Sequence, residues 1–311
     1  MAPVGKRRPV TQPSLGFIGL GAMGEPMARS LRTHGFPVAA AVHRRRDAIE
    51  RLKEAGVTEA PDYATLAAQS DITILCVPDS PQVEESLFSE RGVAAGAKPG
   101  SVVIDMSTIS PISSKAFAQR LAEKKIAFVD APVSGGPARA QTGTLTIMVG
   151  AEPDIFGRVE AVLKGMGNPF HLGGIGMGET VKLVNQIIIA NVMIANAEAL
   201  VFAKRAGADL EAVRKVIATA TGSNYVLDQW LPKTWFADSF EGGFALDLLR
   251  KDVAAALDAA RAMEFPMPAS ALAYQLYTAR SAEGDGALDY SAIAKWYERI
   301  AGDETNAGHV R

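Results

Sequence analysis

The sequence predicts an α/β fold in which an N-terminal doubly wound, mostly parallel sheet is followed by an all-α C-terminal domain. Two observations carry this prediction. Between residues 15 and 174, short apolar runs alternate with helical segments, which is typical of consecutive βαβ units. Beyond the glycine-rich stretch 173–178, every segment has a helical pattern and none resembles a strand. A long helix that starts near Glu179 is expected to join the two domains.

The strands of the first domain are predicted from apolar runs. The run 72–77 is apolar at nearly every position, as is typical of a strand that is covered by helices on both faces. Ligands of such sheets bind at the carboxyl ends of the strands, which points to the loops that begin at Pro78, Ser107 and Ala131. We expect strands at 15–19, 38–42, 72–77, 102–105, 127–130, 144–149 and 169–171, and C-terminal helices at 179–206, 210–219, 223–231, 246–263, 269–283 and 290–301.

A glycine motif lies directly between the first strand and the first helix. Its first glycine permits a tight turn, its second lets the backbone approach a pyrophosphate, and its third lets helix and strand pack closely. The amide groups and the dipole of the first helical turn attract phosphates. This context predicts a Rossmann-like dinucleotide-binding domain, with a plain strand–helix turn as the alternative. The expected cofactor residues of this loop are Gly19, Leu20, Gly21, Ala22, Met23 and Gly24.

The end of the second strand indicates which dinucleotide is bound. Instead of the acidic residue that an NAD site places there, the strand runs into His43-Arg44-Arg45-Arg46. A guanidinium pairs with a 2′-phosphate, whereas a carboxylate repels it. Arg44 and Arg45 therefore favour NADP over NAD, and a solvated basic turn is the alternative. Asp47, the first acidic residue, is interpreted as the N-cap of the next helix.

Composition excludes several classes of protein. Of the 311 residues, 48% are hydrophobic and 21% are charged, with a net charge of −2, which is typical of a soluble globular protein without a nucleic-acid or membrane partner. The single cysteine, Cys76, cannot form an internal disulfide, so we expect a packing residue in a cytoplasmic protein. Residues 1–13 lack the apolar region of a signal peptide. Polar residues interrupt the stretch 187–202, which we interpret as a buried helix rather than a membrane span.

These observations divide the chain into four parts. We expect a loose N-terminal tail at 1–13 and a dinucleotide-binding domain at 14–174. An all-helical domain for substrate binding and oligomerisation follows at 175–302, and a C-terminal tail at 303–311. The four histidines have no ligand spacing and the acidic residues form no clear metal pattern, so we predict no metal.

Four segments resemble one family. They are 16–28 (GFIGLGAMGEPMA), 130–136 (DAPVSGG), 178–186 (GETVKLVNQ), and Gly243-Phe244 leading to Lys251-Asp252. In this order and spacing, the chain resembles the β-hydroxyacid dehydrogenases, which include 3-hydroxyisobutyrate dehydrogenase and tartronate semialdehyde reductase. The resemblance implies hydride transfer between a nicotinamide cofactor and a small β-hydroxy acid or its semialdehyde, bound between the two domains of a homodimer or homotetramer.

The resemblance also implies catalytic residues. Lys182 corresponds to the catalytic lysine of the family, whose ammonium exchanges a proton with the reacting oxygen. Asn185, three residues later on the same helix face, would position the substrate and the lysine. Taken alone, Lys182 would be interpreted as an exposed helix lysine.

A second implied group binds the substrate carboxylate. Ser134, Gly135 and Gly136 follow a strand, and their backbone N–H groups and the serine hydroxyl form a cradle for an anion, with an ordinary flexible loop as the alternative. The continuation to Arg139 departs from the pattern of the family. Arg139 either faces solvent or adds a cation near the carboxylate, which leaves the identity of the substrate open.

Further cofactor contacts are implied by the same resemblance. Thr108 would lie near the nicotinamide and its ribose, Val77 and Pro78 along the adenosine, Lys251 would reach the cofactor from the second domain, and Phe244 would pack near the nicotinamide. Each has a structural alternative. Thr108 would be a capping hydroxyl, Val77 and Pro78 would only end the strand, Lys251 would be a surface lysine, and Phe244 would be a core aromatic.

The predicted function is that of an NAD(P)-dependent oxidoreductase with Lys182 as its acid/base. If NADP is the cofactor, reduction of a semialdehyde is the expected direction. The alternative within enzymes is an NADPH-dependent reductase of glyoxylate, succinic semialdehyde or an imine, although imine-acting relatives generally lack this lysine. A phosphogluconate-type decarboxylation is disfavoured by the lack of a basic cluster, and a non-catalytic cofactor-binding scaffold by the presence of Lys182 and Asn185.

Overall fold

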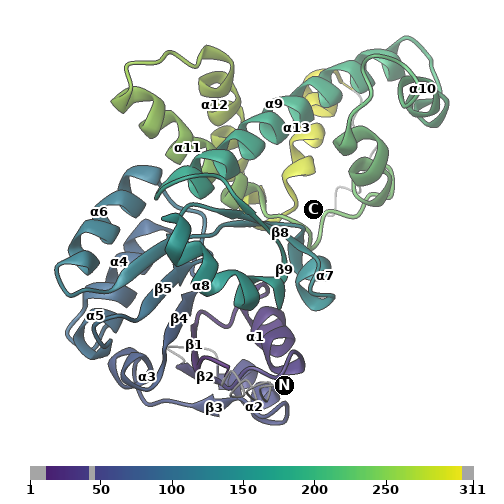
Figure 1. The fold of residues 1–311 in the computed structure, drawn as a ribbon. Coiled ribbons are helices and arrows are strands. Elements are labelled where there is room, and N and C mark those ends of the chain that lie inside the picture. Colours follow the sequence, from purple (N-terminus) through teal and green to yellow (C-terminus); the bar gives the residue numbers. More distant parts are fainter. Residues whose placement is uncertain (1–11, 42–45, 303–311) are drawn as a thin grey trace, which may run out of the picture. The chain divides into compact units, whose positions relative to one another are not determined.

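The chain forms two compact units, Met1–Glu179 and Thr180–Arg311, which Figure 1 shows as a ribbon. The computed structural model describes residues 12–41 and 46–302. The units are called unit 1 and unit 2 below, and each is described by itself.

Unit 1 is built on a six-stranded parallel sheet with the strand order β3-β2-β1-β4-β5-β6 (Figure 1). Phe17 of β1 lies opposite Ala40 of β2 on one side and Ile74 of β4 on the other. The order reverses on the two sides of β1, which makes the carboxyl end of this strand the switch point where such sheets bind ligands. The prediction of a doubly wound parallel sheet is confirmed. Its strands are β1 (Leu15–Ile18), β2 (Val38–Ala41), β3 (Thr58–Glu59), β4 (Ile72–Leu75), β5 (Val102–Asp105) and β6 (Ala127–Asp130).

Successive residues of the central strands enter two different cores. Phe17 packs with Leu31 and Leu52 on one face of the sheet, whereas Ile18 packs with Leu66 and Leu87 on the other. This alternation explains the continuously apolar strands, since both faces are covered. The helices of unit 1 are α1 (Gly24–Thr33), α2 (Arg46–Lys53), α3 (Tyr63–Gln69), α4 (Ser80–Phe88), α5 (Val93–Gly96), α6 (Pro111–Ala122), α7 (Gly136–Gln141) and α8 (Pro153–Lys164).

A second sheet of three strands differs from the expectation. β8 (Leu145–Val149) pairs in parallel with β9 (Gly167–His171) and antiparallel with β7 (Val133–Ser134). The predicted strands 144–149 and 169–171 therefore do not extend the large parallel sheet. Only residues 131 and 132 separate β6 from β7, too few for the crossover that a parallel pair needs. The two-residue strands β3 and β7 show no periodicity in the sequence and were not predicted.

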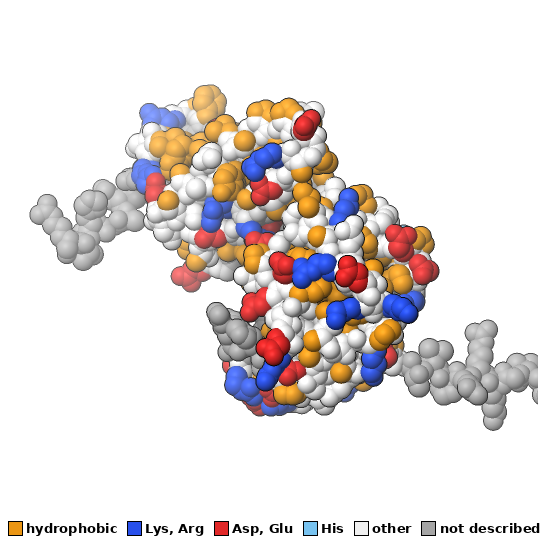
Figure 2. Space-filling model, turned by 90° about the vertical axis from the view of Figure 1, so that its left-hand side faces the viewer, with side chains coloured by type: hydrophobic (Ala, Val, Ile, Leu, Met, Phe, Trp, Pro, Cys, Tyr) orange, Lys and Arg blue, Asp and Glu red, His pale blue; other side chains and the backbone are white. Residues whose placement is uncertain are grey.

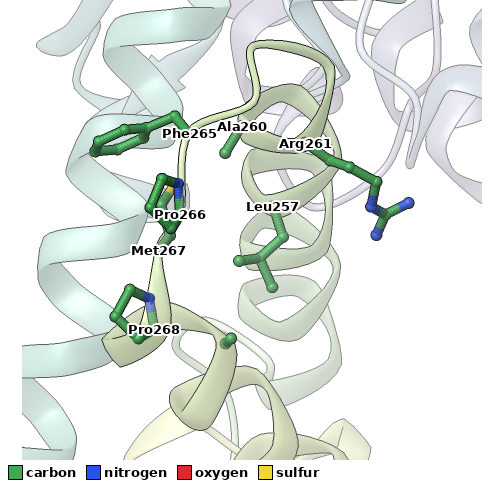
Figure 3. A pocket seen from close by; sticks show the side chains of 8 residues that line it. Leu257, Ala260, Arg261, Phe265, Pro266, Met267 and Pro268 are labelled. Carbon is green, nitrogen blue, oxygen red and sulfur yellow. The ribbon is translucent and has the colours of Figure 1, made fainter.

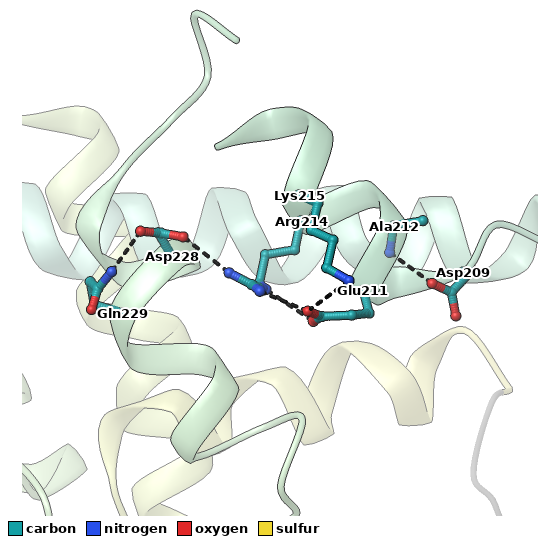
Figure 4. A network of polar contacts seen from close by, with 7 residues as sticks. All are labelled: Asp209, Glu211, Ala212, Arg214, Lys215, Asp228 and Gln229. Carbon is teal, nitrogen blue, oxygen red and sulfur yellow. Dashed lines mark hydrogen bonds and ion pairs between the residues drawn. The ribbon is translucent and has the colours of Figure 1, made fainter. Parts of the chain in front are cut away.

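Unit 2 is helical, as expected, and the strand pairing described in it is limited to one isolated bridge between Ala245 and Asp289. Its core contains Met193, Leu249, Val253 and Tyr277. A polar network joins α10 to η1, because Arg214 binds both Glu211 and Asp228 (Figure 4). The elements are α9 (Met177–Arg205, which begins in unit 1), α10 (Leu210–Ile217), η1 (Val226–Trp230, a π-helix), η2 (Leu231–Lys233), α11 (Leu246–Ala262), α12 (Pro268–Ala282), η3 (Asp285–Ala287), η4 (Tyr290–Ala292) and α13 (Ile293–Ile300).

Helix α9 (Met177–Arg205) closely matches the predicted helix 179–206. By length and composition it could cross a membrane, so the expectation that the segment is too short and too polar is wrong on that test. Core helices of globular proteins pass the same test. Within unit 2, the Tyr277 hydroxyl donates to the Ala190 carbonyl, and Asn196 exchanges amide hydrogen bonds with Asn224. These contacts attach α9 to the core of unit 2, and 39% of its most apolar stretch is buried within the chain.

The start of α9 is held by one buried carboxylate. Asp130, at the end of β6, accepts the N–H of Gly176 at 2.7 Å and that of Glu179 at 2.9 Å. A side chain at Gly150 would come within 2.5 Å of Asp130 Oδ1, and one at Gly178 would overlap the Met148 carbonyl oxygen. Burial raises the pKa of Asp130, although the backbone N–H groups favour the carboxylate. The two glycines therefore leave the room that this buried cap needs.

The Asp130 cap predicts a marked difference between two isosteric substitutions. In Asp130→Asn an NH₂ donor replaces one of the two buried oxygen acceptors and faces a backbone N–H group. We expect this to lower the free energy of unfolding by about 2 kcal/mol. Asp209→Asn is the matched control, because Asp209 caps α10 in an exposed position and Asn is an equally good cap. Urea denaturation measures both variants, and equal losses would contradict the role assigned to Asp130.

Candidate functional site

The three glycines of the loop after β1 have distinct surroundings. Gly19 has a φ of +95°, and a side chain there would overlap the carbonyl oxygen of Cys76. A side chain at Gly24 would overlap the carbonyl oxygen of Gly19, whereas one at Gly21 would meet no atom within 4 Å. The first and third glycines thus serve close packing and the second leaves the loop open to a ligand, as a dinucleotide requires.

A hollow of about 360 Å³ opens at this loop, at the start of α1. It is lined by Gly21, Ala22, Glu25, Pro26, Arg29 and Gln141. Leu20 is buried and Met23 packs against the core, so these two can contribute only backbone groups to a ligand. The open glycine and the N–H groups of the first helical turn fit the pyrophosphate of a dinucleotide.

The negative charge of Glu25 in this hollow is balanced by nearby arginines. Glu25 forms a two-pronged pair with Arg51 of α2, with both N–O distances at 2.8 Å, and Arg29 lies 3.9 Å away. The hydrogen bonds from Arg51 lower the pKa of the Glu25 carboxyl. The negative charge of Glu25 therefore opposes a bound phosphate less than an unpaired carboxylate would.

The two arginines that predict NADP, Arg44 and Arg45, lie outside the described residues. The next one, Arg46, pairs with Glu59 at 3.0 Å and with Glu50 at 3.6 Å. Asp47 lies inside the first turn of α2, so its interpretation as the N-cap is wrong. In that position it pairs with Arg51 instead.

Two loops at the carboxyl ends of β4 and β5 are tied together. Asp105, fully buried, accepts the N–H of Ser107 at 3.0 Å, and the Ser107 hydroxyl accepts the N–H of Val77 at 3.0 Å. The predicted cofactor residues Val77 and Pro78 are thereby held beside the loop that carries Thr108. Asp105 and Ser107 were not among the predicted site residues, although an Asp followed two residues later by Ser is a turn pattern that sequence reasoning can recognise.

Cys76 packs against the core beside this loop, as predicted. Burial, together with the nearby Asp105, raises the pKa of its thiol to about 12. A thiol of this kind is protonated at neutral pH and is a poor nucleophile.

The predicted carboxylate cradle has a backbone that only glycine adopts easily. Ser134 ends β7, and Gly135 and Gly136 follow with φ values of 135° and 67°. The stem of Arg139 lies over Gly135, since a Cβ there would be 2.7 Å from Arg139 Cδ. Among the described residues, the exposed guanidinium of Arg139 has neither a hydrogen bond nor an ion pair.

Unit 2 brings four other predicted residues together. Lys182 is only 7% exposed, which argues against the interpretation as a surface lysine. Its Nζ lies 5.9 Å from the ring centroid of Phe244, within the range of a cation–π contact. Asn185 lies three residues later on α9, and Lys251 is connected to it through the contacts described next.

A chain of polar contacts links the two helices. Asn185 Nδ2 donates to Gln186 Oε1 at 2.9 Å, and Gln186 Nε2 donates to Asp252 Oδ2 at 2.6 Å. Lys251 Nζ lies 2.9 Å from Asp252 Oδ1. Gln186 and Asp252 are each 2% exposed. Both stood in the family motifs, but neither was predicted as a site residue.

The backbone around Phe244 is fixed by Asp289. Its Oδ2 accepts the N–H of Phe244 at 3.0 Å, and its Oδ1 accepts the indole N–H of Trp230 at 3.0 Å. A side chain at Gly243 would overlap Asp289. Asp289 was also missed, because its partners lie 45 and 59 residues away along the chain.

Another hollow, of about 440 Å³, lies on unit 2 where α11 connects to α12. Figure 3 shows it lined by Phe265, Pro266, Met267 and Pro268, with the side chain of Arg261 extending away from them. None of the predicted site residues lines it. In the described part of the chain, no three His, Cys, Asp or Glu side chains gather closely enough to hold a metal ion.

Comparisons with known protein families and structures agree with the fold and with the family resemblance. The family model described as the NAD binding domain of 6-phosphogluconate dehydrogenase matches residues 14–184. The model described as NAD-binding of NADP-dependent 3-hydroxyisobutyrate dehydrogenase matches residues 176–297.

Individual proteins are similar over nearly the whole chain. The chain is 37% identical to 2-(hydroxymethyl)glutarate dehydrogenase of Eubacterium barkeri, covering 94% of this chain and 98% of that protein. It is 38% identical to 2-hydroxy-3-oxopropionate reductase of Escherichia coli K12, covering 92% and 98%. The structure of Mycobacterium tuberculosis 3-hydroxyisobutyrate dehydrogenase with L-serine superimposes with a TM-score of 0.85 at 29% identity, covering 92% and 99%.

The glycine loop predicts opposite outcomes for two Gly→Ala substitutions. Gly24→Ala places a methyl group against a backbone oxygen, and we expect it to lower the free energy of unfolding by about 2 kcal/mol. Gly21→Ala meets open space, so we expect stability to change by less than about 1 kcal/mol while NADPH binding weakens about tenfold or more. Thermal melting and nicotinamide fluorescence titration measure the two effects. Unchanged binding in Gly21→Ala would contradict the assigned approach of the cofactor.

Proposed function

The chain belongs to the β-hydroxyacid dehydrogenase family, and from this premise we propose how its residues share the reaction. The protein is an NAD(P)-dependent oxidoreductase that acts on small hydroxy acids or the corresponding semialdehydes. The observation that carries the assignment of residues is the burial of Lys182 beside Phe244, with Asn185 on the same helix.

Lys182 is the proposed acid/base. A bound nicotinamide dinucleotide supplies or accepts the hydride. Lys182 Nζ takes the proton of the substrate hydroxyl during oxidation and returns it to the carbonyl oxygen during reduction. A buried ammonium is less well solvated than an exposed one, which eases the transfer of its proton. Asn185 positions this lysine and the reacting oxygen.

Ser134, Gly135 and Gly136 are proposed to hold the substrate carboxylate. The φ values of the two glycines support this proposal, because they leave the backbone N–H groups of the turn free of obstructing side chains. A carboxylate fixed at this point aligns the carbon that exchanges hydride, which is the main contribution a protein makes to such chemistry.

For the cofactor we propose NADP rather than NAD. The argument is the run Arg44-Arg45, which follows β2 in the sequence, where an NADP-binding domain carries the residues that bind the 2′-phosphate. The remaining proposed contacts of the cofactor are Gly19 to Gly24, Val77, Pro78, Thr108, Phe244 and Lys251. With NADPH as the cellular reductant, reduction of a semialdehyde is the proposed direction.

We also propose that the enzyme is a cytoplasmic homo-oligomer. Helix α9 carries apolar side chains that remain exposed within the chain, among them Val184, Ile188 and Phe202. Exposed apolar groups of this size support contact with another copy. On the face shown in Figure 2, basic and acidic side chains are interspersed, which supports a small-molecule enzyme rather than a nucleic-acid partner.

A substrate with two carboxylates is the proposed preference. Arg139 supports this preference, because its stem lies over Gly135 and its guanidinium has no acidic partner among the described residues. The relative from Eubacterium barkeri is named for 2-(hydroxymethyl)glutarate, a hydroxy acid with two carboxylates. One carboxylate would bind the cradle and the other would pair with Arg139.

Lys182→Met tests the central assignment. We expect kcat to fall by about 10²- to 10⁴-fold, because the acid/base is lost, while the dissociation constant of NADPH stays within about twofold. The assay follows nicotinamide absorbance with NADPH or NADH and a panel of semialdehydes and glyoxylate. A variant with unchanged turnover would contradict the role of Lys182, and a faster wild-type reaction with NADH would contradict the NADP proposal alone.

Arg139→Met tests the substrate preference. We expect the ratio of kcat/KM for 2-(hydroxymethyl)glutarate to that for 3-hydroxyisobutyrate to fall about fivefold, as for the loss of one exposed ion pair. Arg91→Met, an exposed arginine of the same unit, is the matched control and should leave the ratio unchanged. An unchanged ratio in Arg139→Met would refute the preference while leaving the dehydrogenase assignment intact.

A further inference from the structure

The polar chain between α9 and α11 has a direction. Asp252 Oδ1 lies 2.9 Å from the Lys251 ammonium, so the group is a carboxylate and can only accept hydrogen bonds. Its other oxygen, Oδ2, therefore must face the NH₂ of Gln186, at 2.6 Å. The orientation of the Gln186 amide follows from this acceptor.

The orientation of the Gln186 amide in turn determines that of the Asn185 amide. Since Gln186 turns its NH₂ toward Asp252, it presents Oε1 to Asn185, and Asn185 must donate with Nδ2, at 2.9 Å. This leaves Oδ1 as the atom of Asn185 that is not used by Gln186. A single carboxylate thus determines which end of the Asn185 amide is offered to its surroundings.

Burial makes this ordering strict. Gln186 and Asp252 are each 2% exposed, so water cannot easily replace a misdirected hydrogen bond. If the chain were reversed, the Gln186 carbonyl would face the carboxylate and two acceptors would meet. The arrangement in which Asn185 donates with Nδ2 to Gln186 is therefore the stable one.

We propose that Asp252 is a positioning residue that serves both sides of the reaction. Through Gln186 it makes Asn185 present Oδ1, an acceptor that aims an N–H of Lys182, which precedes Asn185 by three residues on α9. Through its other oxygen it holds Lys251, the lysine proposed to reach the cofactor. This inference rests on the roles proposed above for Lys182 and Lys251.

Because Asp252 contacts both Gln186 and Lys251, two variants are expected to give different results. Asp252→Asn can donate as well as accept, so the amide chain can reverse and Lys251 loses its counter-ion. Gln186→Met cuts the chain to Asn185 but leaves the pair of Lys251 and Asp252. Asp258→Asn is the matched control, because it makes the same change in an exposed position of α11.

The experiment measures kcat, KM and their pH profiles for the best substrate of the wild-type enzyme, and separately the dissociation constant of NADPH. We expect kcat to fall about tenfold in both Asp252→Asn and Gln186→Met, which is the scale of one lost hydrogen bond to a charged group. The dissociation constant of NADPH should rise at least threefold or so in Asp252→Asn only. The Asp258→Asn control should match the wild type.

The pH profile separates positioning from simple structural support. In Asp252→Asn, a donor facing the Lys182 ammonium and the loss of a nearby negative charge both disfavour the charged lysine. The inflection of kcat for oxidation should therefore move to lower pH. Circular dichroism and thermal melting establish that each variant is folded.

Three results would overturn the inference. The first is an Asp252→Asn enzyme that melts earlier but keeps its kcat and pH profile. The second is an Asp252→Asn enzyme with unchanged NADPH affinity, and the third is an equal loss of NADPH affinity in Gln186→Met. If the wild type converts no hydroxy acid, the proposed function fails by itself, and the NADPH titration still decides whether Asp252 holds Lys251.

Discussion

The buried carboxylate of Asp130 is the constraint on which the start of α9 depends. It ends the last strand of the parallel sheet and accepts two N–H groups at the start of α9, the helix that carries Lys182. A helix that begins at a buried acceptor has a fixed first turn, because its first N–H groups are satisfied there. Gly150 and Gly178 exist beside it because any side chain would displace the cap.

The same device recurs at each functional segment. A buried carboxylate accepts N–H groups, from two residues away at Asp105 and from 45 to 66 residues away at Asp130, Asp252 and Asp289, and so fixes a loop or an amide in one orientation. Burial is costly for a charge, and the cost is offset only when its oxygens are satisfied, which makes each arrangement specific. The members are Asp105 at the loops after β4 and β5, Asp130 at α9, Asp252 between α9 and α11, and Asp289 at Phe244.

This pattern explains what the sequence could predict. The glycine loop and the large sheet were predictable, because turn, strand and helix signals are local. Lys182 was named as a candidate because a family motif surrounds it. Gln186 and Asp252 were not, since they are 66 residues apart and their bond depends on how two helices pack. The split into two sheets was missed for a related reason: the pairing of β7 with β8 has no signal in the two residues Val133 and Ser134.

Burial also separates what can change from what cannot. Lys182, Gln186 and Asp252 are buried, and Gln186 and Asp252 are bonded to each other, so a substitution at either of these two disturbs the other. Arg139 is exposed on a short helix and its guanidinium makes no hydrogen bond or ion pair among the described residues, so it can be replaced at little cost to the fold. Arg139, the residue proposed to select the substrate, is therefore not one of the buried residues around Lys182.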